Sequence, residues 1–253
     1  MQYRLLLTAV AFLLFSLVAC MPVEKGKTDS DMAYYHYTLG VASLNEQNAA
    51  GALKEFLEAE KFDDRDPEIQ AGMAQAYLLK RAYDLAEERF EIALKLSDED
   101  PKYNNNLGSL YLTMGRYDDA IISFQTAADN LLFDRPEMSW AGIGLANVQK
   151  QDYPAAERAY RKAMEINPTY YMASFRLGEL YYKQDRPVEA LDMFTHTVDL
   201  VPGFLNARYW LGLVYMKMKE PEAAKKAFLE VIRRDPKSDM ARLSRNYLKI
   251  INK

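Results

Sequence analysis

A pattern that returns at a fixed spacing along most of the chain restricts its fold more than any other feature of the sequence. One copy contains Leu177-Gly178, Tyr181, Ala190, Phe194 and Pro202. Gly178 and Ala190 lie on two successive amphipathic segments, where small side chains let two helices cross closely and larger ones fill the space around the crossing. One helical hairpin of this size cannot bury its apolar faces alone, so its copies must stack.

Six copies of this pattern follow one another, and one alanine marks the position of each. It stands at residues 52, 86, 120, 156, 190 and 224. The steps between these alanines are equal except the one after the third copy, where two extra residues fall around Asn130 to Pro136. We place the repeats at about 33–66, 67–100, 101–136, 137–170, 171–204 and 205–238. Apolar and basic residues in 239–253 are spaced as in an amphipathic helix, which predicts a helix that caps the open end of the stack.

The pattern resembles the tetratricopeptide repeat (TPR), which has a period of about 34 residues, and the resemblance extends from residue 33 to about residue 236. The composition agrees, because the chain is rich in Ala, Leu, Tyr, Glu and Lys and has no alternating β-branched runs. The resemblance implies an all-α fold, a right-handed α-solenoid of six TPR hairpins with a C-terminal capping helix. It also implies a protein-binding scaffold, in which the first helix of each pair lines the concave side.

The N-terminus begins with an uncharged apolar run from Leu5 to Ala19. This run is shorter than a membrane-spanning helix and has the size of a signal-peptide core. It ends in Leu17-Val18-Ala19-Cys20, which resembles the lipobox of bacterial lipoproteins. The resemblance implies that residues 1–19 are removed as a signal peptide and that Cys20 carries diacylglycerol and an acyl chain such as palmitate. An ordinary secretory signal with a chance cysteine, or an uncleaved anchor, is the alternative.

The residue after the cysteine is Met21. In many Gram-negative bacteria an Asp at this position retains lipoproteins in the inner membrane, so Met21 implies the outer membrane, with the TPR domain in the periplasm. Residues 20–32 contain Pro, Gly, Ser, Thr and charges without periodicity. We therefore predict that the lipidated Cys20 is followed by a flexible tether to residue 32.

The residues needed for catalysis or metal binding do not come together in this sequence. His36 and His196 have no partner at ligand spacing, and there is no phosphate-binding glycine loop or nucleophile elbow. The net charge of −4 gives no electrostatic reason for nucleic-acid binding. We therefore expect no enzyme activity, no metal, no small-molecule substrate, no nucleic-acid partner and no cofactor apart from the covalent lipid on Cys20.

Two local features resemble one branch of the TPR lipoproteins. The first is Asn105-Asn106-Leu107-Gly108 followed by Gly115-Arg116-Tyr117-Asp118, and the second is the insertion Asn130–Pro136. Both are similar to features of the type IV pilus biogenesis lipoproteins (PilF/PilW and Tgl type). This resemblance implies a pilotin, whose groove holds a secretin subunit and promotes its localisation and multimer assembly. The alternative is a periplasmic TPR scaffold with another envelope partner, in outer-membrane protein assembly or in recruiting peptidoglycan enzymes.

The groove is predicted to lie on the helix faces opposite the Gly and Ala residues at the helix crossings. The insertion adds two residues, Leu132 and Phe133, to the predicted binding surface. The predicted partner-binding residues are Tyr34, Tyr37, Asn105, Asn106, Ser109, Leu132, Phe133, Phe175, Tyr182, Tyr209, Leu213 and Met216. The same phase places Gln75, Leu78, Leu112 and Leu145 on this face. A few aromatic anchors on such a face suit an extended protein segment. The alternative is that most of these residues pack on the neighbouring second helix.

Overall fold

The computed structural model describes residues 28–251, and this part of the chain forms thirteen α-helices. They are α2 (Asp29–Asn45), α3 (Ala49–Glu60), α4 (Pro67–Leu79), α5 (Tyr83–Leu96), α6 (Pro101–Met114), α7 (Tyr117–Asp129), α8 (Pro136–Gln149), α9 (Tyr153–Ile166), α10 (Tyr171–Lys183), α11 (Pro187–Leu200), α12 (Leu205–Lys217), α13 (Pro221–Arg234) and α14 (Asp239–Ile251). The predicted signal peptide and Cys20 lie outside the described residues.

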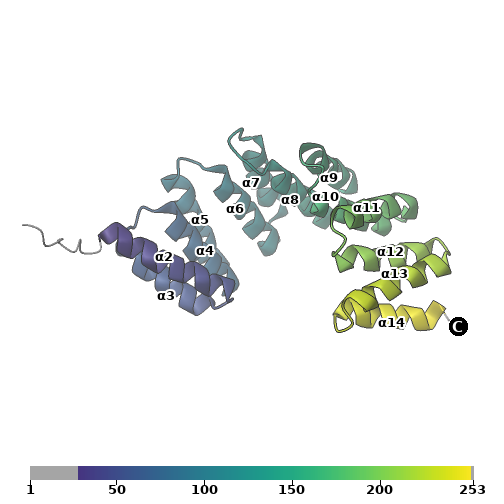
Figure 1. Cartoon of the computed structure of the whole chain (residues 1–253). Helices are drawn as coiled ribbons and strands as arrows, with labels where there is room; N and C mark the ends of the chain where they lie inside the picture. The colour runs from purple at the N-terminus through teal and green to yellow at the C-terminus, as the bar shows by residue number, and fades with distance from the viewer. Residues whose placement is uncertain (1–27, 252–253) are drawn as a thin grey trace, which may run out of the picture.

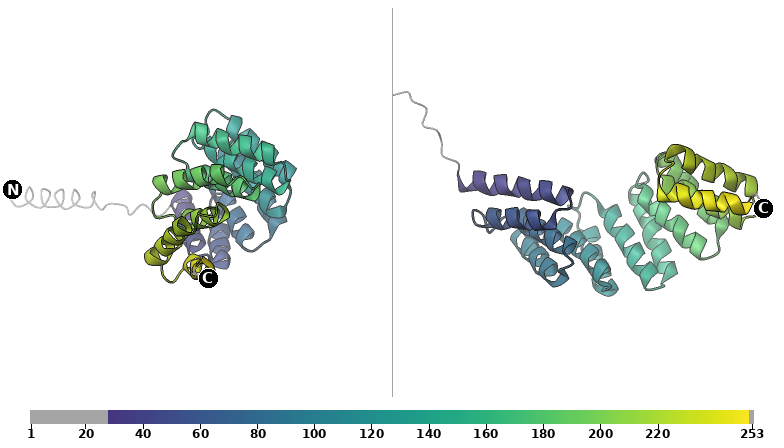
Figure 2. Two further views of the ribbon diagram at one scale, coloured as in Figure 1. Left: turned by 90° about the vertical axis from the view of Figure 1, so that its right-hand side faces the viewer. Right: turned by 90° about the horizontal axis from the view of Figure 1, so that it is seen from below.

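The helices pack as six consecutive hairpins, from α2–α3 to α12–α13, and α14 packs on the last hairpin. We call α2, α4, α6, α8, α10 and α12 the A helices, and the second helix of each pair the B helix. The pairs follow one another along a curved stack, with α2 at one end and α14 at the other (Figure 1), as two further views also show (Figure 2). This confirms the predicted all-α stack of hairpins.

The A helices lie on the inner side of the curve. Most of them contact the next A helix along the stack, as α2 contacts α4 and α6 contacts α8. The B helices pack mainly against the helices directly before and after them. The buried apolar residues form four clusters that follow one another along the stack, with members from Ala33 to Ile251.

An aromatic ring on the B helix packs directly against a glycine on the A helix of the same hairpin. A Cβ placed on Gly178 would lie 2.8 Å from the ring of Phe194, which is closer than real Cβ contacts. Phe194 is fully buried. The same contact recurs in the pairs Gly40–Phe56, Gly108–Phe124, Gly144–Tyr160 and Gly212–Phe228. The glycines are therefore required by the close approach of the rings.

The next element in the stack covers the same ring from its other side. Gly72 of α4 approaches Phe56 as closely as Gly40 does. Trp210 of α12 stacks on Phe194 with ring centroids 5.6 Å apart, and Tyr247 of α14 stacks on Phe228 at 5.3 Å. One ring thus connects its own hairpin to the next element of the stack.

The stack begins earlier than the repeat pattern indicated. Thr28 caps α2, because its hydroxyl accepts a hydrogen bond from the Asp31 backbone N–H at 3.1 Å. The Asp31 carboxylate in turn accepts one from the Thr28 N–H at 2.9 Å. This reciprocal capping box satisfies free backbone donors of the first turn. Residues 29–32, which were predicted to belong to the flexible tether, are therefore helical.

The junction between the second and third hairpins differs from the others. In residues 28–251, it is the one connection between hairpins that contains residues with positive φ, namely Asp98 at 53° and Glu99 at 64°. The Glu99 N–H donates to the Leu94 carbonyl at 3.1 Å, which ends α5 with a left-handed turn. This turn redirects the chain before α6, and α4 and α6 hardly touch each other. The inner surface of the stack is therefore interrupted between α4 and α6.

We expect Gly178→Ala to destabilise the stack. The new methyl group would meet the Phe194 ring at 2.8 Å, and both partners are buried. Overpacking of this kind costs about 1–3 kcal/mol, more than the gain of about 1 kcal/mol that alanine brings to a helix. Urea unfolding followed by circular dichroism measures the change. Gly203→Ala is the control, because nothing lies within 4 Å of a Cβ there, and equal stability of both variants would contradict the role of Gly178.

Candidate functional site

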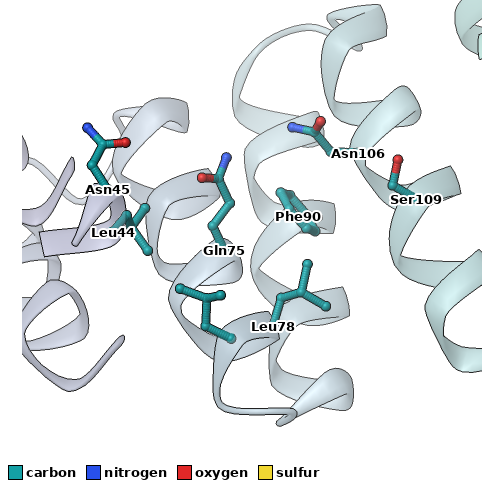
Figure 3. A pocket seen from close by; sticks show the side chains of 8 residues that line it. Leu44, Asn45, Gln75, Leu78, Phe90, Asn106 and Ser109 are labelled. Atoms are coloured by element: carbon teal, nitrogen blue, oxygen red, sulfur yellow. The ribbon is translucent and has the colours of Figure 1, made fainter. Parts of the chain in front are cut away.

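A pocket of about 410 Å³ opens on the inner side of the stack, where α4 and α6 separate. Three A helices contribute to it, and Phe90 of α5 forms its floor (Figure 3). It is lined by Leu44, Asn45, Gln75, Leu78, Leu79, Phe90, Asn106 and Ser109. We call it the first pocket. No charged side chain is among these residues.

Three side-chain amides stand in a row along the first pocket. Figure 3 shows those of Asn45, Gln75 and Asn106 above the rings and methyl groups of Phe90 and Leu78. In the described part of the chain none of the three amides makes a side-chain hydrogen bond. Each amide can both donate and accept, as a peptide group does. An apolar floor below a row of available amides suits an extended peptide, whose backbone repeats about every 3.3 Å.

A second pocket, of about 230 Å³, adjoins the first along the inner side. The two share Ser109, so they adjoin each other at α6, and we call the two pockets together the groove. Asn105 lines the second pocket and accepts a hydrogen bond from the Ser139 hydroxyl at 2.9 Å, which holds the amide in place. The second pocket is lined by Asn105, Ser109, Leu112, Phe124, Met138, Ala141, Gly142, Leu145, Tyr170, Met172 and Arg176.

The groove carries little charge. Arg176 is its one ionic side chain among the lining residues, and the Glu179 carboxylate pairs with it at 2.8 Å. A strongly acidic or basic partner would find no matching surface in the groove. The lining favours an uncharged segment, with apolar side chains directed into the pockets and a backbone that bonds to the amides.

Other charged groups of the described chain serve the stack itself. The Tyr111 hydroxyl donates to the Glu87 carboxylate at 2.8 Å, and the Arg116 guanidinium pairs with the same carboxylate at 2.8 Å. Burial, and then the hydrogen bond to Glu87, raises the pKa of Tyr111 to about 12. The same three residue types recur two repeats later as Glu157, Tyr181 and Arg186. These carboxylates bind neighbouring helices together and are not available to a ligand.

The predicted asparagines lie where the groove was expected. Asn106 lines the first pocket, Asn105 lines the second, and Ser109 lines both. Gln75 and Leu78 line the first pocket, as the helical phase had placed them on this face, and Leu112 and Leu145 line the second.

The structure separates the other N-terminal and insertion residues from the groove lining. Tyr34 is 69% exposed on α2, and Tyr37 is half-buried against the Phe56 ring at 5.9 Å. Leu132 is 88% exposed in the connection 130–135, and Phe133 next to it is half-buried. None of these four residues lines either pocket.

The predicted aromatic anchors of the last hairpins belong largely to the core, which corrects the sequence-based groove. Phe175 is 4% exposed and packs edge-on against Phe204, with centroids 4.9 Å apart. Leu213 is 9% exposed in the cluster around Phe228. The helical phase did place them on an A helix, but the following hairpin covers Phe175, and Leu213 is packed in a cluster that includes residues of α14.

Tyr182, Tyr209 and Met216 are half-buried and also pack within these clusters. The Tyr182 ring meets Trp210 edge-on at 5.2 Å. Burial, followed by the neighbouring Tyr247, raises the pKa of the Tyr209 hydroxyl to about 12. Tyr209 is therefore a packing residue with a desolvated hydroxyl, not a freely accessible anchor.

Sequence reasoning missed four residues that complete the first pocket, Leu44, Asn45, Leu79 and Phe90. Phe90 occupies the buried aromatic position of its B helix, and the repeat pattern alone assigns that position to the core. The connection Ser97–Asp100 lacks the Pro found one residue after the helix cap in the last three repeats, but the connections 61–66 and 130–135 lack it too, so the sequence carried no specific signal for the pocket. The Phe90 ring borders the pocket while it remains only 2% exposed.

Neither an arrangement of side chains that would hold a metal ion nor a helix that would cross a bilayer is present in residues 28–251. No group of three or more His, Cys, Asp and Glu side chains there is arranged to hold a metal ion. None of the described helices has the length and apolar content needed to cross a bilayer.

The curved stack and its inner groove define a helical-repeat scaffold, and comparison with protein families specifies which kind. One tetratricopeptide-repeat model matches residues 72–132, and another matches residues 147–196 and 183–247. Together the matches span more than half of the chain, so this protein belongs to the tetratricopeptide-repeat proteins. Members of this class are protein-binding scaffolds.

Individual similar proteins add to this assignment. Protein O-mannosyl-transferase TMTC3 of Homo sapiens is 31% identical over 103 residues, which cover 39% of this chain and 11% of that protein. The chain thus spans about a tenth of this curated relative.

Two solved structures match nearly their whole length. The structure of Pseudomonas aeruginosa pilF has a TM-score of 0.70 at 18% identity and covers 88% of this chain and 98% of its own. The structure of PilW, a type IV pilus biogenesis factor, has a TM-score of 0.73 at 17% identity, with coverages of 83% and 97%. At these identities the similarity concerns the fold.

We expect Phe175→Ala to lower the stability of the stack, because Phe175 is a core residue and not part of a binding surface. Removing a fully packed phenylalanine costs about 3–5 kcal/mol, because it leaves a cavity between α10 and the following hairpin. Tyr34→Ala is the matched control at an exposed aromatic, and its effect should remain within about 0.5 kcal/mol. Thermal unfolding of both variants measures the difference. A Phe175→Ala protein as stable as wild type would restore the interpretation of Phe175 as a surface anchor.

Proposed function

We propose that this protein is an outer-membrane TPR lipoprotein that acts as a pilotin for the type IV pilus secretin. The observation that carries the proposal is the coextensive fold: the pilF and PilW structures match this chain over nearly their full length, not over a few repeats. The asparagine pair before Gly108 and the insertion 130–136 support the same assignment from the sequence.

The groove across α6 is the proposed binding site for a secretin segment. Its row of amides would bond the backbone of an extended segment, and the floor of Phe90, Leu78 and Leu44 would take an apolar side chain. The low charge of the lining agrees with recognition through backbone and apolar groups. This part of the proposal replaces the aromatic anchors of α10 and α12 with the pockets on α4, α6 and α8.

The proposed mechanism is binding combined with co-localisation, without catalysis. Acyl chains on Cys20 would hold the protein at the inner leaflet of the outer membrane, because each buried CH₂ contributes about 0.8 kcal/mol. A short segment, residues 21–28, would then connect the anchor to α2. A secretin subunit bound in the groove stays at the bilayer, which raises its effective concentration for ring assembly.

We expect Leu79→Asp, combined with Gln75→Ala, to abolish secretin multimers in outer-membrane fractions. The substitutions place a charge beside the apolar floor and remove one of the three amides. Leu85→Asp is the matched control, because Leu85 on α5 is 45% exposed, close to the 47% of Leu79, and does not line either pocket. Gel electrophoresis of unheated membrane samples measures the multimers.

The protein levels of both variants must equal that of wild type. Normal multimers in the groove variant would contradict the groove as the secretin site. Deletion of the gene tests the wider proposal, because intact pili together with envelope fragility would favour a scaffold for another envelope process.

We expect Cys20→Ser to release the protein from the membrane. Serine cannot form the thioether to diacylglycerol, so the processing that depends on it should stop, and labelled palmitate should not be incorporated. The measurement is palmitate labelling followed by separation of membrane and soluble fractions. Met21→Ser is the control next to it and should still be labelled. Incorporation of palmitate into the Cys20→Ser protein would contradict the predicted anchor.

A further inference from the structure

The two end helices of the stack, α2 and α14, differ in the residues that their outer faces expose. At the C-terminal end, Asn246 of α14 stands one repeat length after Gly212, which approaches the Phe228 ring of its partner helix α13. Asn246 therefore marks the face of α14 on which a further B helix would pack. Arg242, Arg245 and Lys249 stand on this face around it, and all are exposed. This face is largely basic, as the solvent-facing end of a solenoid requires, and Ile250 beside Lys249 is 59% exposed on it.

The N-terminal end keeps an apolar surface. Leu39 and Ala42 of α2 stand one repeat length before Met73 and Ala76 of α4, which are completely buried against the first hairpin. On α2 the same two positions are exposed, Leu39 by 38%. Tyr35 stands one repeat length before the completely buried Ile69 and is 47% exposed. The face of α2 that a preceding hairpin would cover thus retains residues of the buried type.

The two end helices carry opposite charge. Asp29 and Asp31 lie in the first turn of α2 and Glu46 follows its last turn, whereas residues 28–46 contain no Lys or Arg. The cap face of α14 has three cations, Arg242, Arg245 and Lys249. α2 and α14 lie at opposite ends of one molecule (Figure 1), so they can meet only between two copies.

We propose that the basic face of α14 in one copy covers the apolar and acidic face of α2 in a second copy, head to tail. The aliphatic stems of Arg and Lys cover apolar surface while their charged ends reach carboxylates. Guanidinium groups also lie over tyrosine rings, and this chain already contains that contact, with Arg116 4.3 Å from the Tyr111 ring centroid. The stack of hairpins would then continue from one copy into the next.

A symmetric contact of α2 with α2 is disfavoured, because it would bring the acidic residues of both copies together. A head-to-tail contact leaves one end of each copy open, so assemblies can grow beyond dimers unless the rotation closes a ring. This inference does not depend on the identity of the groove partner.

The test measures the mass of the soluble form that lacks residues 1–20, which retains every residue of the four apolar clusters. Sedimentation velocity over a concentration series up to about 0.2 mM should show a mass that rises with concentration. The association should weaken with added salt, because part of it is ionic.

Each of two variants blocks the proposed contact surface at one end of the stack. Leu39→Lys removes an apolar contact and places a cation opposite the α14 cations, and it should weaken association about tenfold or more. Arg245→Glu with Lys249→Glu reverses the charge of the α14 face and should do the same. Leu57→Lys is the matched control, because Leu57 on α3 is 37% exposed, and it should associate as wild type does. Far-UV circular dichroism verifies that all variants remain helical.

A mixture of the two end variants decides the geometry. Each alone should associate about tenfold more weakly, or more weakly still, but the mixture should form a dimer of one copy of each at the wild-type strength, because one intact α2 face and one intact α14 face remain. A wild-type protein that stays monomeric throughout the series overturns the proposal. Self-association of the α14 variant alone would overturn it as well, in favour of a symmetric α2 contact, and so would equal weakening by Leu57→Lys.

Discussion

The contact of a B-helix aromatic ring with a glycine on the A helix is the interaction on which the whole structure depends. It determines how closely the two helices of a hairpin approach, since a methyl group at Gly178 or Gly212 would overlap the ring. The next element then covers the same ring, as Trp210 covers Phe194. Association within a hairpin and between hairpins is therefore coupled through one side chain, which is why no single hairpin is stable alone.

Function in such a stack comes from departures from the repeat. Where α4 and α6 separate, the Phe90 ring becomes the floor of the first pocket, and the Phe124 ring lines the second, whereas Phe194 and Phe228 lie under the next element of the stack. The left-handed turn at Asp98 and Glu99 is the local reason for this separation. The neutral amides around the pocket give it hydrogen-bonding capacity without charge, while carboxylates such as Glu87 and Glu157 connect neighbouring helices. A scaffold can thus gain a binding groove without changing its core.

The candidate site could be predicted from the sequence where one helix alone decides it. Asn105, Asn106 and Ser109 face the groove because their phase on α6 is opposite to Gly108, and the phase follows from the repeat. Phe175 and Leu213 have the same kind of phase but are buried, because the next element of the stack, the following hairpin or α14, packs over them. A periodic pattern states which side of a helix a residue occupies, but it does not state how far the next helix extends over that side.

The sequence by itself determined the all-α class, the six hairpins and their order, because small residues at fixed spacing allow only one way for neighbouring helices to cross. It also located the groove on the A helices. Only the tertiary structure decided which inner residues remain accessible, that the first pocket opens at the junction of the second and third hairpins, and that α2 leaves an apolar face at one end. These features depend on angles between hairpins, and such angles arise from the summed packing of residues far apart in the chain.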